Sequence, residues 1–293
     1  MMKKLTITGT ALALVLQAGS AFAATSSGST STASASDVAP SVFSKIGMTY
    51  GGYLYGPALG NMDMNQPNAT GGQRSDGIML YNSLSASYKM SGSEKVYVNP
   101  RFNMRPTQAT NGRFEMLNPR IGYKNSSIYS NGNFNIAFAF NPELGLTEKS
   151  QKKGMRVAPG INPNLTYTLG RWTFGLDNYA RAYLYSKNAV MNPQTGKGKD
   201  IDVALATIPN VSYQINPRLS TALATEIEAG HYRTASASDI DSLGTNVNAT
   251  LYWEAVPSKW TVGPYVKVFP FGPGATVNPD TTQLGVEIAG TIF

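Results

Sequence analysis

The stretch IDVALATIPNVSYQ, residues 201–214, indicates the fold class of this chain. Its odd positions carry the apolar side chains, among them Ile201, Val203, Leu205, Val211 and Tyr213. The even positions include the polar residues Asp202, Asn210, Ser212 and Gln214. A period of two over this length predicts a β-strand with one apolar face and one polar face.

The same alternation recurs along the chain, between clusters of Gly, Asn, Pro and Ser. It predicts twelve strands, at residues 43–56, 77–90, 95–105, 113–124, 134–141, 154–169, 171–185, 200–214, 218–231, 244–256, 259–269 and 280–293. Most connections alternate between tight and long. This is typical of an all-β, transmembrane antiparallel up-and-down barrel with both termini in the periplasm. The connection at 125–133 is longer than a tight turn should be.

The N-terminal segment has the features of an export signal. Two lysines, Lys3 and Lys4, precede an apolar run from Leu5 to Leu16, and the small residues Ala21 and Ala23 follow it. We expect a signal peptide at 1–23, a disordered periplasmic leader at 24–40 and the barrel at 41–293. The apolar run is too short to cross a bilayer as a helix. The 293 residues include no cysteine, which excludes a disulfide scaffold and a lipid-anchored lipoprotein.

The chain ends in a predicted strand with the aromatic residue Phe293. The signal, the strand pattern and this terminus resemble the bacterial outer-membrane β-barrel superfamily, in particular its porin-like, twelve-stranded monomeric channels. No specific family is identified. The resemblance implies a location in the outer membrane of a Gram-negative bacterium. It also implies contact with membrane lipid and lipopolysaccharide, and recognition by the barrel-insertion machinery during biogenesis.

Two features depart from a regular barrel. In the superfamily the terminal aromatic residue usually shares the apolar face, but here Ile288 and Ile292 hold the other parity, so we expect a bulge or a frayed last residue. Prolines also fall inside the predicted strands, where each removes a ladder hydrogen bond. We predict local bulges at Pro100, Pro119, Pro159, Pro163, Pro209 and Pro264.

Parity places two sets of charges on the inner wall. The basic set, on the third to seventh strands, is Arg101, Arg105, Arg113, Arg120, Arg156 and Arg181. The acidic set, on the eighth to twelfth strands, is Asp202, Glu226, Glu228, Glu254 and Glu287. Opposed rows of charge create a transverse field, and charged rows select ions in pores. We therefore expect an outer-membrane channel for passive diffusion of small hydrophilic solutes, with an anion preference. The alternative is a structural or adhesive barrel whose charges pair across the bore and block it.

An outer-membrane hydrolase is a further alternative. The single histidine, His231, has no serine two residues away, which the phospholipase of this architecture requires. Glu226 and Glu228 are spaced as an acid pair, and Asn61, Asp63 and Asn65 begin like a calcium loop but lack its Gly and Glu. Such features more often line a wet lumen or a surface loop. We expect no enzyme activity, cofactor, metal or nucleic-acid partner.

Overall fold

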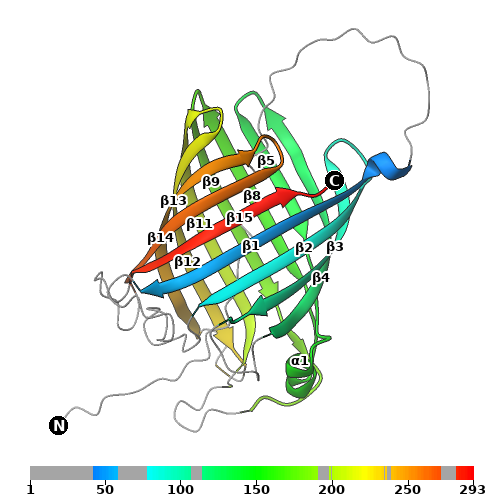
Figure 1. Cartoon of the computed structure of the whole chain (residues 1–293). Helices are drawn as coiled ribbons and strands as arrows, with labels where there is room; N and C mark the ends of the chain where they lie inside the picture. The colour runs from blue at the N-terminus through cyan, green and yellow to red at the C-terminus, as the bar shows by residue number, and fades with distance from the viewer. Residues whose placement is uncertain are drawn as a thin grey trace, which may run out of the picture.

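One antiparallel sheet closes on itself to form a barrel (Figure 1). The computed structural model describes residues 42–58, 78–106, 114–190, 198, 200–233, 235, 239–271 and 282–293. The first elements along the chain are η1 (Val42–Lys45), β1 (Ile46–Ala58), β2 (Met79–Lys89), β3 (Glu94–Met104), β4 (Phe114–Asn131), β5 (Phe134–Phe140), β6 (Glu143–Leu144) and α1 (Glu148–Lys153). They are followed by β7 (Met155–Ala158), β8 (Gly160–Leu169), β9 (Trp172–Ala182), β10 (Leu184–Tyr185), β11 (Ile201–Asn216), β12 (Leu219–Tyr232), β13 (Ile240–Val256), β14 (Trp260–Phe271) and β15 (Gln283–Thr291).

These segments form twelve crossing strands. Three crossings consist of two consecutive segments, β5 with β6, β7 with β8 and β9 with β10. The prediction of a twelve-stranded antiparallel barrel is therefore confirmed, and most strand limits lie within three residues of the predicted ones.

The barrel closes where the last strand pairs with the first. Tyr50 is opposite Gly290, and Leu54 is opposite Val286. Beyond the end of β15, the Ile292 amide donates to the Met48 carbonyl at 2.8 Å, and the Met48 amide donates to the Phe293 carbonyl at 2.9 Å. The final residues are thus outside the strand but still hydrogen-bonded to β1.

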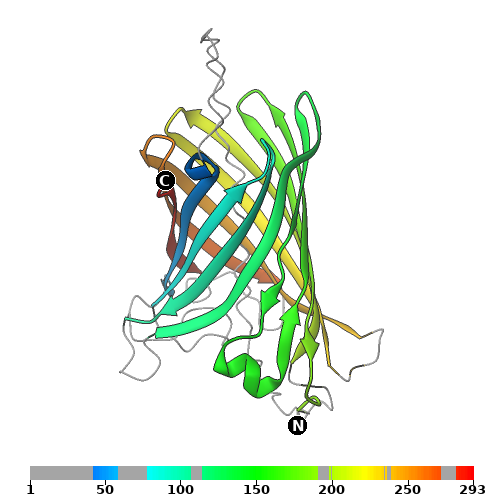
Figure 2. The ribbon, with the colours of Figure 1, turned by 90° about the vertical axis from the view of Figure 1, so that its right-hand side faces the viewer.

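The two ends of the barrel differ. The C-terminus and the start of β1 lie at the end that carries the short turns, whereas α1 lies at the opposite end (Figures 1 and 2). No helix in the described part of the chain is long and apolar enough to span a membrane. The predicted signal peptide and leader lie outside the described residues.

The connection at 125–133 is not a loop. Strand β4 continues to Asn131 and turns into β5 through Gly132, whose φ of 57° suits glycine. A register shift between Asn125 and Tyr129 takes up the extra residues. A side chain supplies one hydrogen bond in this shifted segment, since Asn125 Oδ1 accepts from the Ser127 amide at 2.9 Å. The residues that made this connection too long for a tight turn belong to β4, where they form a bulge.

The prolines behave in two ways. Pro100 and Pro119 face each other across a register shift between β3 and β4, and Pro159 separates β7 from β8. At Pro163, Pro209 and Pro264 the prediction of a bulge is wrong, since the flanking pairs keep one register on both sides. Each of these prolines pairs with one neighbouring strand, and the other ladder skips two residues and resumes. Because a residue in an antiparallel ladder bonds to one neighbour only, the missing amide does not shift the strand.

The two faces of the barrel wall differ in polarity. Large apolar side chains are exposed on the outer face, among them Val98, Met116, Ile121, Ile161, Leu205, Leu223, Leu251 and Val266. The inner face carries buried polar residues, among them Asn82, Asn99, Arg101, Asn118, Arg181, Asn246, Gln283 and Glu287. An apolar outer band with a polar interior is the arrangement of a membrane barrel and not of a water-soluble one.

A glycine lets the closing strands pack together. A Cβ on Gly285 would lie 2.2 Å from Tyr265 Cζ and 2.5 Å from the Leu54 carbonyl oxygen. We expect Gly285→Val to lower the free energy of unfolding by about 2 kcal/mol, because the backbone of β1 cannot move away. Urea unfolding followed by tryptophan fluorescence measures this. Gly92→Ala is the control, since a Cβ there meets nothing within 4 Å. Equal midpoints for both variants would contradict the packing argument.

Candidate functional site

A charged cluster lies on the inner wall, towards the end that carries α1. Arg101 comes from β3, Arg120 from β4 and Arg181 from β9, and all three are buried. Their common partner is Glu143 on β6. We call these four residues the arginine cluster.

One carboxylate oxygen serves all three guanidinium groups. Glu143 Oε2 lies 2.7 Å from Arg101 Nη2, 3.1 Å from Arg181 Nη1 and 3.5 Å from Arg120 Nε. Three positive charges and one negative charge leave a net charge of +2. Such a surplus attracts anions, most strongly where low-dielectric walls focus the field.

The strand pairing explains the convergence. Glu143 is directly opposite Arg120 across the β4–β6 pair, and Arg101 lies one strand further on. Arg181 must reach Glu143 across the intervening strand, where the inward positions are Ala158 and Gly160. A Cβ on Gly160 would lie 2.9 Å from Arg181 Nε. Small residues on the middle strand therefore make room for the third arginine.

A polar network ties the cluster to α1. Asn118 Nδ2 donates to Glu143 Oε1 at 3.2 Å and to Ser150 Oγ at 2.7 Å, and Ser150 lies in α1. Asn118 Oδ1 accepts from the Thr147 amide at 3.1 Å, and Thr147 is the N-cap of the helix. Asn118 thus fixes the position of α1 relative to the arginines.

The other basic residues have different surroundings. Arg105 Nη2 lies 2.9 Å from Glu115 Oε2. The other oxygen of this carboxylate, Glu115 Oε1, lies 3.6 Å from Lys149 Nζ. Arg113 lies outside the described residues. Arg156, which parity placed inward, is exposed instead, and its Nε donates to Ser186 Oγ at 3.0 Å. The structure therefore brings together three of the six predicted arginines.

The acidic residues are spread along the opposite strands, and three of them have recorded partners there. Asp202 Oδ1 lies 2.6 Å from His231 Nδ1, and Glu226 Oε2 lies 3.6 Å from Lys267 Nζ. Glu287 is buried and accepts from the hydroxyls of Tyr53 and Tyr252 at 3.0 and 2.8 Å. Glu228 and Glu254 are half-buried. The structure does not gather this set into a site.

The residues considered for catalysis have ordinary polar partners in the structure. His231 pairs with Asp202, and Glu226 accepts from Asn246 Nδ2 at 2.7 Å. Within the described residues, no group of three or more His, Cys, Asp or Glu side chains could hold a metal ion. The calcium-like segment at Asn61, Asp63 and Asn65 lies outside the described residues.

Sequence reasoning missed Glu143, the residue at the centre of the cluster. It follows Pro142 directly after a predicted strand, so it was assigned to the loop at 142–153. The strand resumes at Glu143 for two residues and points this side chain at the arginines. The available signal was a single acidic residue two positions after the predicted strand at 134–141, since the preceding predicted strand places Arg120 inward.

Removal of the shared carboxylate should destabilise the barrel. We expect Glu143→Gln to lower the free energy of unfolding by about 3 kcal/mol, because three buried guanidinium groups lose their counter-charge. Urea titration of the refolded protein measures this. Glu254→Gln, a half-buried carboxylate outside the cluster, is the control and should change stability by less than about 1 kcal/mol. A Glu143→Gln variant as stable as this control would refute the role of Glu143.

Comparisons of the sequence with protein families and with curated proteins give no match. Solved structures do match. The COG4313 outer membrane channel from Pseudomonas putida F1 superimposes with a TM-score of 0.50 at 13% identity, over 84% of this chain and 94% of that one. OmpF of Salmonella typhi, in complex with daunomycin, gives a TM-score of 0.45 at 8% identity, over 84% and 97%. The KdgM porin gives 0.44 at 10% identity, over 84% and 99%. The match to the COG4313 channel agrees with the closed antiparallel barrel seen in this chain.

Proposed function

We propose that this protein is a porin-like channel of a Gram-negative outer membrane, through which small hydrophilic solutes diffuse passively and anions are favoured. The observation that carries the proposal is the arginine cluster on the inner wall of a barrel with an apolar exterior. An apolar outer band requires a lipid surrounding, and a polar interior suits aqueous solutes.

The anion preference rests on the imbalance of charge in the cluster. Arginine holds carboxylate and phosphate groups through several donors at once. The Nε atom of Arg181 is buried and forms no hydrogen bond within the described structure. This donor, together with the net charge of +2, would stabilise an anion that reaches the cluster.

A barrel with a closed lumen is the second candidate. It is supported by the burial of Arg101, Arg120 and Arg181, which expose only 6%, 8% and 3% of their side chains. In that case the tie between Asn118 and α1 would hold a plug in place, and the loops would carry the function. The two candidates differ in whether the folded protein conducts ions.

Single-channel recording in a planar bilayer distinguishes them. In a salt gradient we expect a steady conductance with a reversal potential of the anion-selective sign. The double substitution Arg101→Ala with Arg105→Ala should reduce the anion-to-cation permeability ratio by roughly fivefold or more. Both partner carboxylates keep another cation in this variant, since Glu143 retains Arg120 and Arg181 and Glu115 retains Lys149.

Arg171→Gln is the matched control, because Arg171 is exposed at a short turn at the other end of the barrel. It should leave the permeability ratio unchanged. Silence from protein that circular dichroism shows to be folded would reject the channel and favour the closed barrel. Conductance without a change of selectivity in the double variant would reject only the role of the arginines.

A further inference from the structure

Three lysines lie side by side on neighbouring strands, towards the end of the barrel that carries the short turns. Lys89 of β2 is directly opposite Lys95 of β3, and Lys95 is directly opposite Lys124 of β4. Lys89 is exposed, and the other two are half-buried. We call these three residues the lysine row. It shares β3 and β4 with Arg101 and Arg120 but lies nearer the other end of the barrel.

The lysine row faces the bore. Tyr88 and Val96, each next to a lysine of the row, are exposed on the outer face of the barrel. Ile121, three residues before Lys124, is exposed on that face too, and the β3–β4 register is regular between these two positions. Because successive side chains of a strand point to opposite faces, all three lysines point inward.

The positive charges of the row repel one another. Residues directly opposite in an antiparallel pair have Cβ atoms about 5 Å apart, and like charges at such positions are destabilising. Lys89 and Lys124 both repel the ammonium group of Lys95. Asp177 of β9 attracts Lys124, and Asp177 Oδ2 also accepts from Asn210 Nδ2 at 3.0 Å. Three cations near one carboxylate leave a surplus of positive charge.

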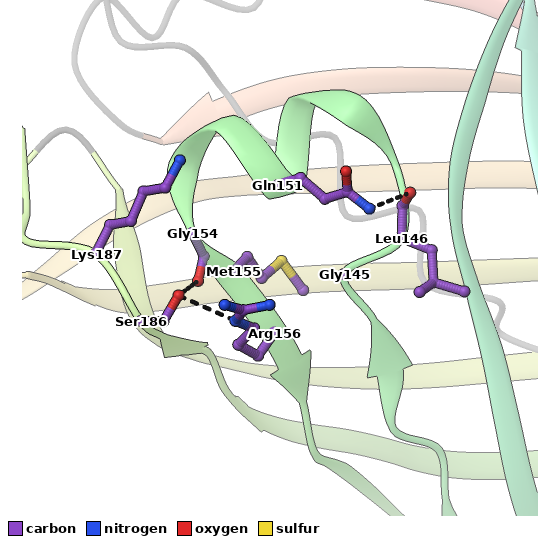
Figure 3. A pocket seen from close by; sticks show the side chains of 8 residues that line it. All are labelled: Gly145, Leu146, Gln151, Gly154, Met155, Arg156, Ser186 and Lys187. Atoms are coloured by element: carbon purple, nitrogen blue, oxygen red, sulfur yellow. Dashed lines mark hydrogen bonds between the residues drawn. The ribbon is translucent and has the colours of Figure 1, made fainter.

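The amines of the row are not bound by the protein. Within the described part of the chain, none of the three forms an ion pair within 4 Å or a hydrogen bond. The cations of the pocket beside α1, whose volume is about 410 Å³, differ in this respect (Figure 3). There Lys187 Nζ donates to the Lys152 carbonyl at 3.0 Å, and Arg156 Nε donates to Ser186 Oγ at 3.0 Å. Each ammonium group of the lysine row thus keeps its donors for a ligand.

A tyrosine separates the lysine row from the arginine cluster. Lys124 lies four residues from Arg120 on β4, which is about 13 Å along a strand. Gly122 lies between them, and a Cβ there would be 2.5 Å from Tyr97 Cζ, so the ring of Tyr97 covers this glycine. At 0.1 M salt, exposed charges more than about 10 Å apart are largely screened from each other. The lysine row is therefore a site of its own.

The spacing of the row favours a ligand with several charges. Adjacent strands lie about 4.8 Å apart, so the three amines spread their charge over roughly 10 Å. A monovalent anion neutralises one of them. An anion with several charges can contact all three and remove their mutual repulsion. Lysine carries a compact charge on a flexible stem, so the row can adjust to anions of different shape.

We propose that the lysine row binds small anions that carry several negative charges, near the mouth of the barrel that has the short turns. The proposal rests on the proposed function in one respect, because it names multivalent anions as a class of solute that meets this wall of the channel. The binding itself does not require ion conduction.

Isothermal titration calorimetry of the refolded protein in an uncharged detergent tests the site. The probe is tripolyphosphate at low salt, and acetate is the monovalent comparison. We expect the triple variant Lys89→Gln, Lys95→Gln and Lys124→Gln to bind tripolyphosphate at least roughly 20-fold more weakly, since each lysine attracts several of its charges. Acetate should bind far more weakly than tripolyphosphate to the unmodified protein.

Two further variants locate the binding. The matched control, Arg171→Gln with Arg218→Gln and Lys259→Gln, removes three exposed cations from short turns at the same end and should keep its affinity within about twofold. The variant Arg101→Ala with Arg105→Ala should also keep the lysine site. Equal losses in the two triple variants, or loss in the Arg101 and Arg105 variant alone, would overturn the proposal.

Urea unfolding gives a second readout. Without the probe, the lysine variant should unfold at a higher urea concentration than the unmodified protein, because the repulsion is gone. Tripolyphosphate should raise the midpoint of the unmodified protein and leave that of the lysine variant unchanged. A rise of equal size in both would contradict the site. A silent barrel that still binds tripolyphosphate through the row would reject the channel and keep this site, whereas a conducting barrel without this binding would do the reverse.

Discussion

The pairing of β1 with β15 is the constraint on which the rest of the structure depends. It gives every crossing strand a partner on both sides, so within the described strands no edge remains unpaired. In lipid no water is present to satisfy such groups, and a sheet can cross only when it is closed. Closure also fixes which face of every strand is inside. Alternate residues of each strand therefore lie outside, where they are apolar, or inside, where they are polar.

Closure does not require regular strands. Pro163, Pro209 and Pro264 each leave a short gap in one ladder, and the register continues beyond it. Where the register does shift, the consequences are larger. The shift at Pro100 and Pro119 lies between Arg101 and Arg120 in the β3–β4 pair, and both of these arginines are buried. At the shift beside Arg156, this cation is exposed. Register shifts of the barrel wall thus lie beside Arg120 and Arg156.

This distribution explains what the sequence could predict. A period of two is a local property, so the twelve strands, their limits and the alternation of turns follow from composition along the chain. A bulge depends on the partner strand, whose register is not a local property. The prediction of a loop at 125–133 was therefore wrong, and Arg156 is exposed next to a register shift that the sequence did not predict. Arg101, Arg120 and Arg181 do meet in one cluster. Glu143 was missed because its three partners come from β3, β4 and β9, and no spacing in the sequence connects them.

The position of Glu143 also changes the electrostatics of the bore. Two opposed rows of charge would cancel in a narrow barrel if they paired across it. Instead, the counter-charge of the arginines is Glu143, on the same side of the barrel. The acidic residues have other partners: Asp202 pairs with His231, Glu226 with Lys267, and Glu287 accepts from two tyrosines. Burial of charge demands pairing, and one carboxylate satisfies this demand only in part for three guanidinium groups. The arginine cluster therefore keeps a net charge of +2 that Glu143 does not neutralise.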